Sequence, residues 1–265
     1  MSENKKEHTF VICAYKDSKY LEDCINSVIC QKLYSDVILT TSTPSKFING
    51  LCNKYMIPMY INEGESGITQ DWEFALSKVT TPLATITHQD DIYYNNYSEV
   101  VVSKYRSNPN MLIFFSDYYE IRLDDVVKHN MLLMIKRIML LPLRIKRFQS
   151  VKWIRRMILS FGSPICCPSV TYNLKLLPNK RFNNHFRTNE DWEAWERYSK
   201  LNGDFVYCND VLVAHRIHQE SETSLTIKET GRSHEDYEMF RKFWPDFFAS
   251  FLTKQYKRSE NSNKI

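Results

Sequence analysis

Short apolar segments alternate with amphipathic helical segments over the first third of the chain, and this alternation limits the folds open to it. The expected strands are residues 9–14, 36–41, 59–62 and 83–87. The expected helices between them are residues 21–29, 45–55 and 70–78. Strands that alternate with helices predict an α/β fold with a mostly parallel sheet and helices on both faces. Ligands of such sheets bind beyond the carboxyl ends of the strands.

The pattern changes after a further helix (97–105) and strand (111–116). Residues 126–160 contain nine basic and no acidic residues, interleaved with apolar ones. A second compact part follows, in which we expect a helix, a strand and an aromatic helical end at residues 189–200, 205–215 and 237–251. The last residues, 258–265, read as a polar tail.

Bulk properties narrow the class of protein. With 265 residues, 43% of them hydrophobic, the chain can bury one substantial core. A net charge of only +4 argues against a dedicated nucleic-acid binder. The polar N-terminus predicts no secretory signal, and no window resembles a spanning helix. Seven cysteines without C-x-x-C spacing predict reduced thiols in a cytoplasmic protein.

Asp90 and Asp91 come directly after the expected strand 83–87. Two carboxylates there suit Mg²⁺ or Mn²⁺, which prefer hard oxygen ligands. An Asx turn after a strand is the structural alternative. The position at the carboxyl end of a parallel strand favours the metal interpretation.

Further polar groups lie in the second part of the chain. Glu190 and Asp191 lie at the start of an expected helix. They either interact favourably with the helix dipole or provide a general base. His215 and His218 flank Arg216 at the end of an expected strand. A histidine there is either structural or a metal ligand, and Arg216 can balance phosphate charge.

Several common catalytic motifs are absent from the sequence. Residues 64–67 (GESG) do not form a P-loop, and no G-x-S-x-G elbow is present. Cys166 and Cys167 lie between prolines and apolar residues, so we interpret them as buried or loop-lining thiols rather than nucleophiles.

Four segments, in order, resemble the inverting family 2 glycosyltransferases of bacterial surface-polysaccharide synthesis. These segments are FVICAYKDSKYLEDCINSVICQ (10–31), THQDDIYY (87–94), TNEDWEAW (188–195) and VAHRIHQESET (213–223). They are similar to the family's opening strand and helix, its D-x-D region, its Glu-Asp motif and its late histidine segment. The resemblance covers about residues 9–224 and implies the glycosyltransferase A fold, a Rossmann-like mostly parallel mixed sheet flanked by helices, with a C-terminal acceptor-side helical segment.

The resemblance also implies residue roles. The donor nucleotide would be bound by Ala14, Tyr15, Thr41, Ser42, Gln89 and Asp90. Mn²⁺ or Mg²⁺ would be bound by Asp90, Asp91 and His218. Asp191, beside Glu190, would be the catalytic base. Arg216 and Trp192 would contact phosphate and acceptor.

Two departures from the family pattern stand out. Many relatives carry two aspartates after the second strand to hold the nucleobase, whereas this chain has LTTSTPS (39–45). Thr41 and Ser42 do not supply that carboxylate, so the identity of the base stays open. The first acidic position of the D-x-D motif is His88.

We therefore expect an inverting, metal-dependent glycosyl transfer from a nucleotide-sugar donor to a glycan or lipid-linked oligosaccharide. Residues 1–125 would bind the donor and residues 161–257 the acceptor. Residues 126–160 are either a solvated basic face or a contact with the cytoplasmic face of the inner membrane. The alternatives are an inactive nucleotide-sugar-binding protein and a peripheral membrane adaptor.

Overall fold

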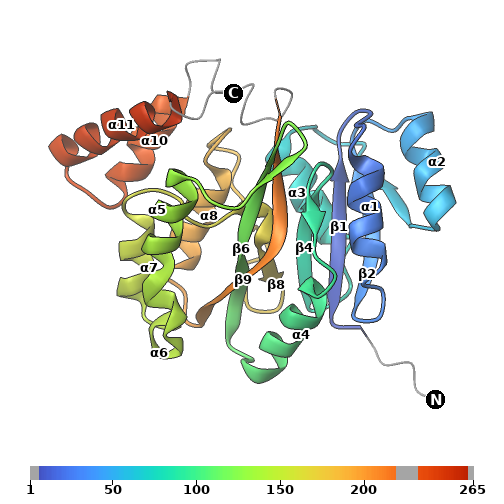
Figure 1. The fold of residues 1–265 in the computed structure, drawn as a ribbon, viewed down its shortest axis with the longest axis horizontal. Helices are drawn as coiled ribbons and strands as arrows, with labels where there is room; N and C mark the ends of the chain where they lie inside the picture. Colours follow the sequence, from blue (N-terminus) through green and yellow to red (C-terminus); the bar gives the residue numbers. More distant parts are fainter. Residues whose placement is uncertain (1–5, 219–231, 262–265) are drawn as a thin grey trace.

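The computed structural model describes residues 6–218 and 232–261, which form a nine-stranded sheet with helices on both faces (Figure 1). Eight strands follow the order β3-β2-β1-β4-β8-β6-β9-β5, and β7 pairs with β6 outside this path. The mixed α/β fold expected from the alternating pattern is thus confirmed. The last residues of the segment that resembles the family, 219–224, lie outside the described residues.

The first half of the sheet is parallel. Its strands are β1 (His8–Ala14), β2 (Ser35–Thr41), β3 (Met59–Ile61) and β4 (Leu83–His88). His8 lies opposite both Ser35 and Leu83 in the two parallel ladders that flank β1. Because the ladders are in step, the polar residues that follow β1, β2 and β4 gather at one edge of the sheet.

The second half of the sheet mixes directions. β8 (Thr171–Asn173) runs antiparallel between β4 and β6 (Met111–Arg122), and β9 (Asp204–Ile217) runs parallel to β6. Two short strands, β5 (Ile92–Tyr93) and β7 (Asp125–Val127), pair antiparallel with β9 and β6. β5 brings the chain after Asp90 and Asp91 directly alongside the end of β9.

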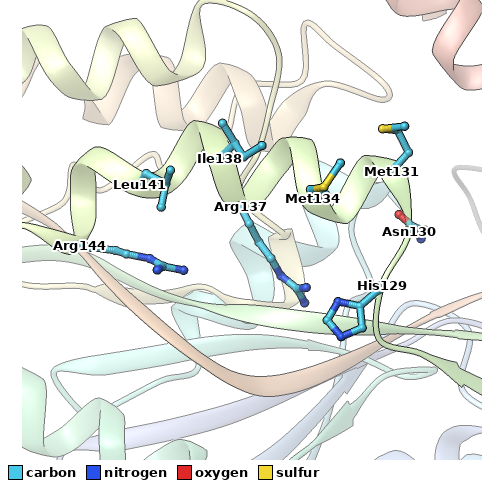
Figure 2. A pocket seen from close by; sticks show the side chains of 8 residues that line it. All are labelled: His129, Asn130, Met131, Met134, Arg137, Ile138, Leu141 and Arg144. Carbon is cyan, nitrogen blue, oxygen red and sulfur yellow. The ribbon is translucent and has the colours of Figure 1, made fainter.

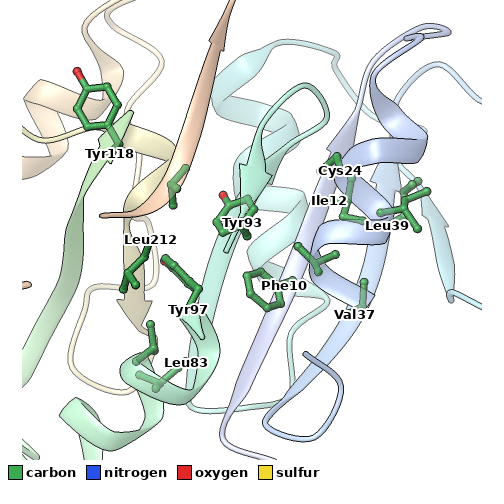
Figure 3. Packing of buried hydrophobic residues seen from close by; sticks show 14 of the residues in the cluster. Phe10, Ile12, Cys24, Val37, Leu39, Leu83, Tyr93, Tyr97, Tyr118 and Leu212 are labelled. Atoms are coloured by element: carbon green, nitrogen blue, oxygen red, sulfur yellow. The ribbon is translucent and has the colours of Figure 1, made fainter. Parts of the chain in front are cut away.

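Alternation along β1 explains the two layers of core. Phe10 and Ile12 face one cluster, whereas Val11 faces the other side of the sheet. The first face carries α1 (Leu21–Ile29), α2 (Lys46–Tyr55) and α4 (Tyr97–Ser107), whose buried residues belong to the same cluster as Phe10. Figure 3 shows Cys24 of α1 and Tyr97 of α4 in this cluster. The opposite face carries α3 (Ile68–Ser77), α7 (Lys152–Leu159) and α8 (Glu190–Tyr198).

The basic segment 126–160 folds into short helices beside β6 and β9 (Figure 1). They are α5 (Met131–Leu140), the 3₁₀ helix η1 (Leu141–Arg144), α6 (Lys146–Gln149) and α7. Arg155 of α7 is buried and donates hydrogen bonds to the carbonyl oxygens of Gly203 (2.8 Å) and Leu201 (2.9 Å). Arg156 pairs with the buried carboxylate of Glu196 at 2.5 Å. These contacts attach the basic helices to the sheet and to α8.

The chain end forms two helices where the sequence pattern predicted one aromatic helical end. They are α10 (Arg232–Arg241) and α11 (Asp246–Asn261). Pro245 separates α10 from α11, since proline fits the start of a helix but not its interior. Earlier in the chain, a single-turn 3₁₀ helix, η2 (Cys167–Ser169), precedes β8. Among the described residues, no helix combines the length and the apolarity needed to cross a bilayer.

Candidate active site

The acidic pair lies where β4 ends and the chain turns into β5. Asp90 and Asp91 thereby meet the end of β9, which carries His215 and leads to His218. His88, Asp90 and Asp91 each offer one metal-ligating atom, and these atoms lie within 4.8 Å of one another. The structure thus brings together two of the predicted metal residues, Asp90 and Asp91, and adds His88, which was not predicted as a metal ligand.

Asp91 is the buried centre of this cluster. Its Oδ1 accepts a hydrogen bond from the Arg216 backbone N–H (2.8 Å) and lies 2.9 Å from His215 Nδ1. Its Oδ2 is 3.7 Å from His88 Nδ1. Both Asp91 Oδ2 and His88 Nε2 are buried and lack a hydrogen-bond partner among the described residues. Buried polar atoms without partners are costly, so this donor set fits a cation.

Asp90 is held beside its neighbour by a histidine. His218 Nε2 lies 2.9 Å from Asp90 Oδ2. Burial on its own would raise the pKa of Asp90, but the hydrogen bond from His218 and the charges of the nearby histidines outweigh burial and lower the pKa. Asp90 is therefore ionised at neutral pH, as a metal ligand must be.

Arg216 is fixed by three contacts. Its guanidinium lies 4.2 Å from the ring centroid of Tyr20, its Nε donates to the Asp90 carbonyl oxygen (3.0 Å), and its Nη1 donates to Asp124 (3.1 Å). The cation consequently stands next to the acidic cluster. Tyr20, which sequence reasoning missed, also packs its ring on His218 with centroids 5.1 Å apart.

Gln89 joins the acidic turn to the loop after β1. The backbone N–H of Tyr15 donates to Gln89 Oε1 (3.1 Å), and Gln89 Nε2 donates to the Tyr15 carbonyl oxygen (2.9 Å). Ala14 is buried, whereas the Tyr15 side chain is 45% exposed. The Tyr15 ring is therefore presented to solvent beside the acidic pair.

A carboxylate from another element lies at the end of β2. Ser42 Oγ donates to Asp71 Oδ2 (2.8 Å), and Asn62 Nδ2 donates to Asp71 Oδ1 (2.7 Å). Thr41 is buried and its hydroxyl accepts from the Thr43 N–H. Asp71 belongs to α3. The loop after β2 has no acidic residue of its own, and Asp71 supplies a carboxylate there. Sequence reasoning missed Asp71, because only the fold pairs it with Ser42.

Asp191 lies in the first turn of α8, and its Oδ1 accepts from the Trp192 backbone N–H (2.6 Å). The preceding Glu190 is buried. Burial raises the pKa of the Cys166 thiol well above its usual value, Lys136 opposes this, and Asp91 and Asp191 both add to it. This thiol therefore stays protonated at neutral pH and is no nucleophile.

Trp192 lies in the core rather than on this surface. Its indole is fully buried, donates from Nε1 to the Leu159 carbonyl oxygen (3.0 Å) and packs edge-on against Phe240. This placement gives no support to the expected contact between Trp192 and an acceptor.

Solved structures share this fold. A mannosyltransferase from Pyrobaculum calidifontis, solved with GDP-Man and Mn²⁺, matches 93% of this chain and 69% of its own with a TM-score of 0.62 and 14% identity. S. aureus TarS 1–349 with UDP-GlcNAc matches 94% of this chain and 71% of its own, with a TM-score of 0.62 and 12% identity. No protein-family model matches the sequence, and no curated protein sequence matches it. The expected fold class is confirmed, since these solved structures share the fold of this chain.

Proposed function

We propose that this protein is a metal-dependent glycosyltransferase that moves a sugar from a nucleotide-sugar donor to a glycan acceptor. The observation that carries the proposal is the cluster of His88, Asp90 and the buried Asp91 at the carboxyl edge of the sheet. Of the two solved structures compared above, one is a mannosyltransferase with GDP-Man and Mn²⁺, and the other holds UDP-GlcNAc.

Asp90, Asp91 and His218, joined by His88, would hold Mn²⁺ or Mg²⁺. When bound, the ion supplies positive charge that stabilises the departing nucleoside diphosphate. Arg216 adds a fixed cation beside the same cluster. The donor nucleotide would lie along the edge formed by the ends of β1, β2 and β4, against Ala14, Tyr15, Thr41, Ser42 and Gln89.

Asp191 is the proposed general base, with Glu190 beside it. Its carboxylate would accept the proton of an acceptor hydroxyl while that oxygen bonds to the anomeric carbon and the bond to the diphosphate breaks. One displacement of this kind inverts the anomeric configuration. The rigid start of α8 suits a base, since the group must be held within about 3 Å of the proton it takes.

The proposed setting is the cytoplasmic face of the inner membrane, where the enzyme would extend a lipid-linked oligosaccharide in surface-polysaccharide synthesis. Support comes from the basic segment 126–160, whose nine cations have no acidic residue among them. A juxtaposition of cations and exposed apolar side chains is the chemistry that binds an anionic membrane surface.

Release of nucleoside diphosphate tests the proposal. Nucleotide sugars are screened with Mn²⁺ or Mg²⁺ and lipid-linked acceptors, using the wild type, Asp191→Asn and the control Asp36→Asn. Asp36 lies at the opposite end of the sheet, at the start of β2, where it pairs with Lys6. We expect metal-dependent release that Asp191→Asn lowers by roughly a hundredfold or more and Asp36→Asn leaves unchanged.

Two outcomes would contradict the proposal. Donor binding without release under any acceptor would identify a nucleotide-sugar-binding protein instead. Equal activity of Asp191→Asn and the wild type would remove Asp191 as the base. Unchanged thermal unfolding of the variant would show that any loss of activity is chemical rather than structural.

A further inference from the structure

A cavity of about 380 Å³ lies along α5 and η1 in the basic segment. Its lining residues are His129, Asn130, Met131, Met134, Arg137, Ile138, Leu141 and Arg144 (Figure 2). None of these residues is acidic, and none belongs to the site described above. The cavity therefore combines cationic and apolar groups without a compensating carboxylate in its own lining.

Contacts within the fold hold one of the two arginines of the cavity in place. Arg137 Nη2 donates to the Tyr118 carbonyl oxygen (3.1 Å), and its Nε lies 3.5 Å from Asp117 Oδ2. Arg144 is exposed, and Figure 2 shows its guanidinium on the same side of the helices as that of Arg137. Asp117 is a single carboxylate that faces the positive charges of both Arg137 and Arg144. The cavity consequently keeps a net positive charge.

The apolar part is unusually open to solvent. Met131, Met134, Ile138 and Leu141 are 67%, 50%, 56% and 46% exposed. Trp153 of α7, in the same basic segment, is exposed as well. Large apolar groups that stay exposed beside cations are expected where a protein meets a membrane surface.

We propose that this cavity binds the phosphate of an anionic membrane lipid, with the lipid's apolar portion against Met131, Met134, Ile138 and Leu141. Charge complementarity favours a lipid, because the segment that builds the surface exposes five cations and has no anion. The exposed cations are Lys128, Arg144, Lys146, Arg147 and Lys152. Arg144, with Arg137 behind it, would donate charge-assisted hydrogen bonds to the phosphate oxygens. The lipid binding does not depend on the proposed glycosyl transfer. Only its purpose, which is to hold the enzyme next to a lipid-linked acceptor, rests on that proposal.

Vesicle flotation of the full chain tests this site. Vesicles of phosphatidylcholine are compared with vesicles that also contain phosphatidylglycerol, for the wild type, Arg144→Gln, Met134→Ser and the control Arg147→Gln. Arg147 is an exposed cation of the same segment that does not line the cavity. Arg144→Gln and Arg147→Gln therefore remove the same charge from the same basic segment.

We expect binding only to vesicles with phosphatidylglycerol. Arg144→Gln should weaken it roughly tenfold or more, since a hydrogen bond to a charged group is lost. Arg147→Gln should weaken it about fivefold at most, through general surface attraction alone. Met134→Ser should also reduce binding, because it removes apolar contact area.

Equal losses from Arg144→Gln and Arg147→Gln would overturn the site in favour of diffuse basic attraction. Equal binding to both vesicle types, or binding to neither, would also overturn it. All three side chains are exposed, so their replacement should leave thermal unfolding unchanged. Flotation needs no turnover, so an inactive protein that floats would refute the glycosyl transfer alone.

Discussion

His215 Nδ1 lies 2.9 Å from Asp91 Oδ1, across 124 residues of sequence. Burial on its own would lower the pKa of His215, but the carboxylates of Asp91 and Asp90 outweigh burial and raise it. The contact holds one oxygen of Asp91 and leaves Oδ2 facing His88. His215 therefore positions a proposed metal ligand without having to bind the ion itself.

Removing the His215 imidazole should weaken Mn²⁺ binding. We expect His215→Ala to lower the affinity about tenfold to a hundredfold, because outer partners orient the ligands. His215→Asn should recover part of the loss, since its amide nitrogen can reach Asp91. Titration calorimetry with Mn²⁺ and a nucleoside diphosphate measures this. His185→Ala, an exposed histidine paired with Glu238, is the control, and an effect of equal size there would refute the positioning role.

Asp71 should control how well the donor binds. Its carboxylate ties Ser42 after β2 to Asn62 after β3. We expect Asp71→Ala to raise the donor KM roughly tenfold with little change in kcat, since two charge-assisted hydrogen bonds that order the edge are lost. Steady-state kinetics against the donor checks this. Glu65→Ala, in the adjacent exposed loop, should be neutral, and a loss in kcat alone would contradict the expected role of Asp71.

Folding stability should fall in mild acid because of His8. Its ring is buried between Ser35 Oγ (2.6 Å) and Thr85 Oγ1 (2.8 Å), and burial lowers the pKa of His8 to about 3. The unfolded chain, with a pKa near 6.5, binds the proton more readily. The stability is thus fully present above pH 6.5 and declines as pH falls towards 3, by roughly 1.4 kcal/mol per pH unit.

His8→Gln is the matched test of this pH dependence. The amide keeps polar contacts but does not titrate in this range. Urea unfolding at several pH values between neutrality and pH 5 should show a shallower decline for the variant than for the wild type. Parallel declines would mean that other groups govern the acid sensitivity.

Gly203 should not tolerate a side chain. Its φ is +128°, and a Cβ would come within 2.7 Å of the Asn110 carbonyl oxygen and of Leu112 Cγ. We expect Gly203→Ala to cost roughly 1 to 3 kcal/mol of unfolding free energy. Gly50→Ala is the control, because Gly50 lies inside α2 with no atom within 4 Å of the position an added Cβ would take, and it should stabilise by about 0.5–1 kcal/mol. Denaturant unfolding compares the two, and a loss at both positions would contradict the steric argument.

The longer strands of the first half of the sheet were predictable from their apolar runs, and among the short strands only β3 was. β1, β2 and β4 hold six or seven residues each, enough for a buried run to stand out. β5, β7 and β8 hold two or three residues, too few for any period. The pairing partners of β5 and β8 are distant in sequence, so only the fold selects them, whereas β7 forms a hairpin with β6.

The candidate site was predictable to the extent that it follows strand ends. Asp90 and Asp91 stand out in the sequence because a buried strand leads into them. His88 departs from the acidic motif, yet it completes the cluster in space. The family resemblance implies an acceptor contact for Trp192, whereas the fold places its indole in the core. Spacing alone does not tell which face of a helix is buried.

Arg155 and Arg156 attach α7 to the start of β9 and to α8, the helix that carries Asp191. The proposed lipid-binding surface and the proposed base therefore belong to one connected part of the fold. A protein docked through α5 would hold its catalytic carboxylate at a constant height above the bilayer. Acceptors would then be selected by length, because only a glycan whose terminal hydroxyl stands at that height meets Asp191. The fold would thereby set the length of glycan that the protein extends.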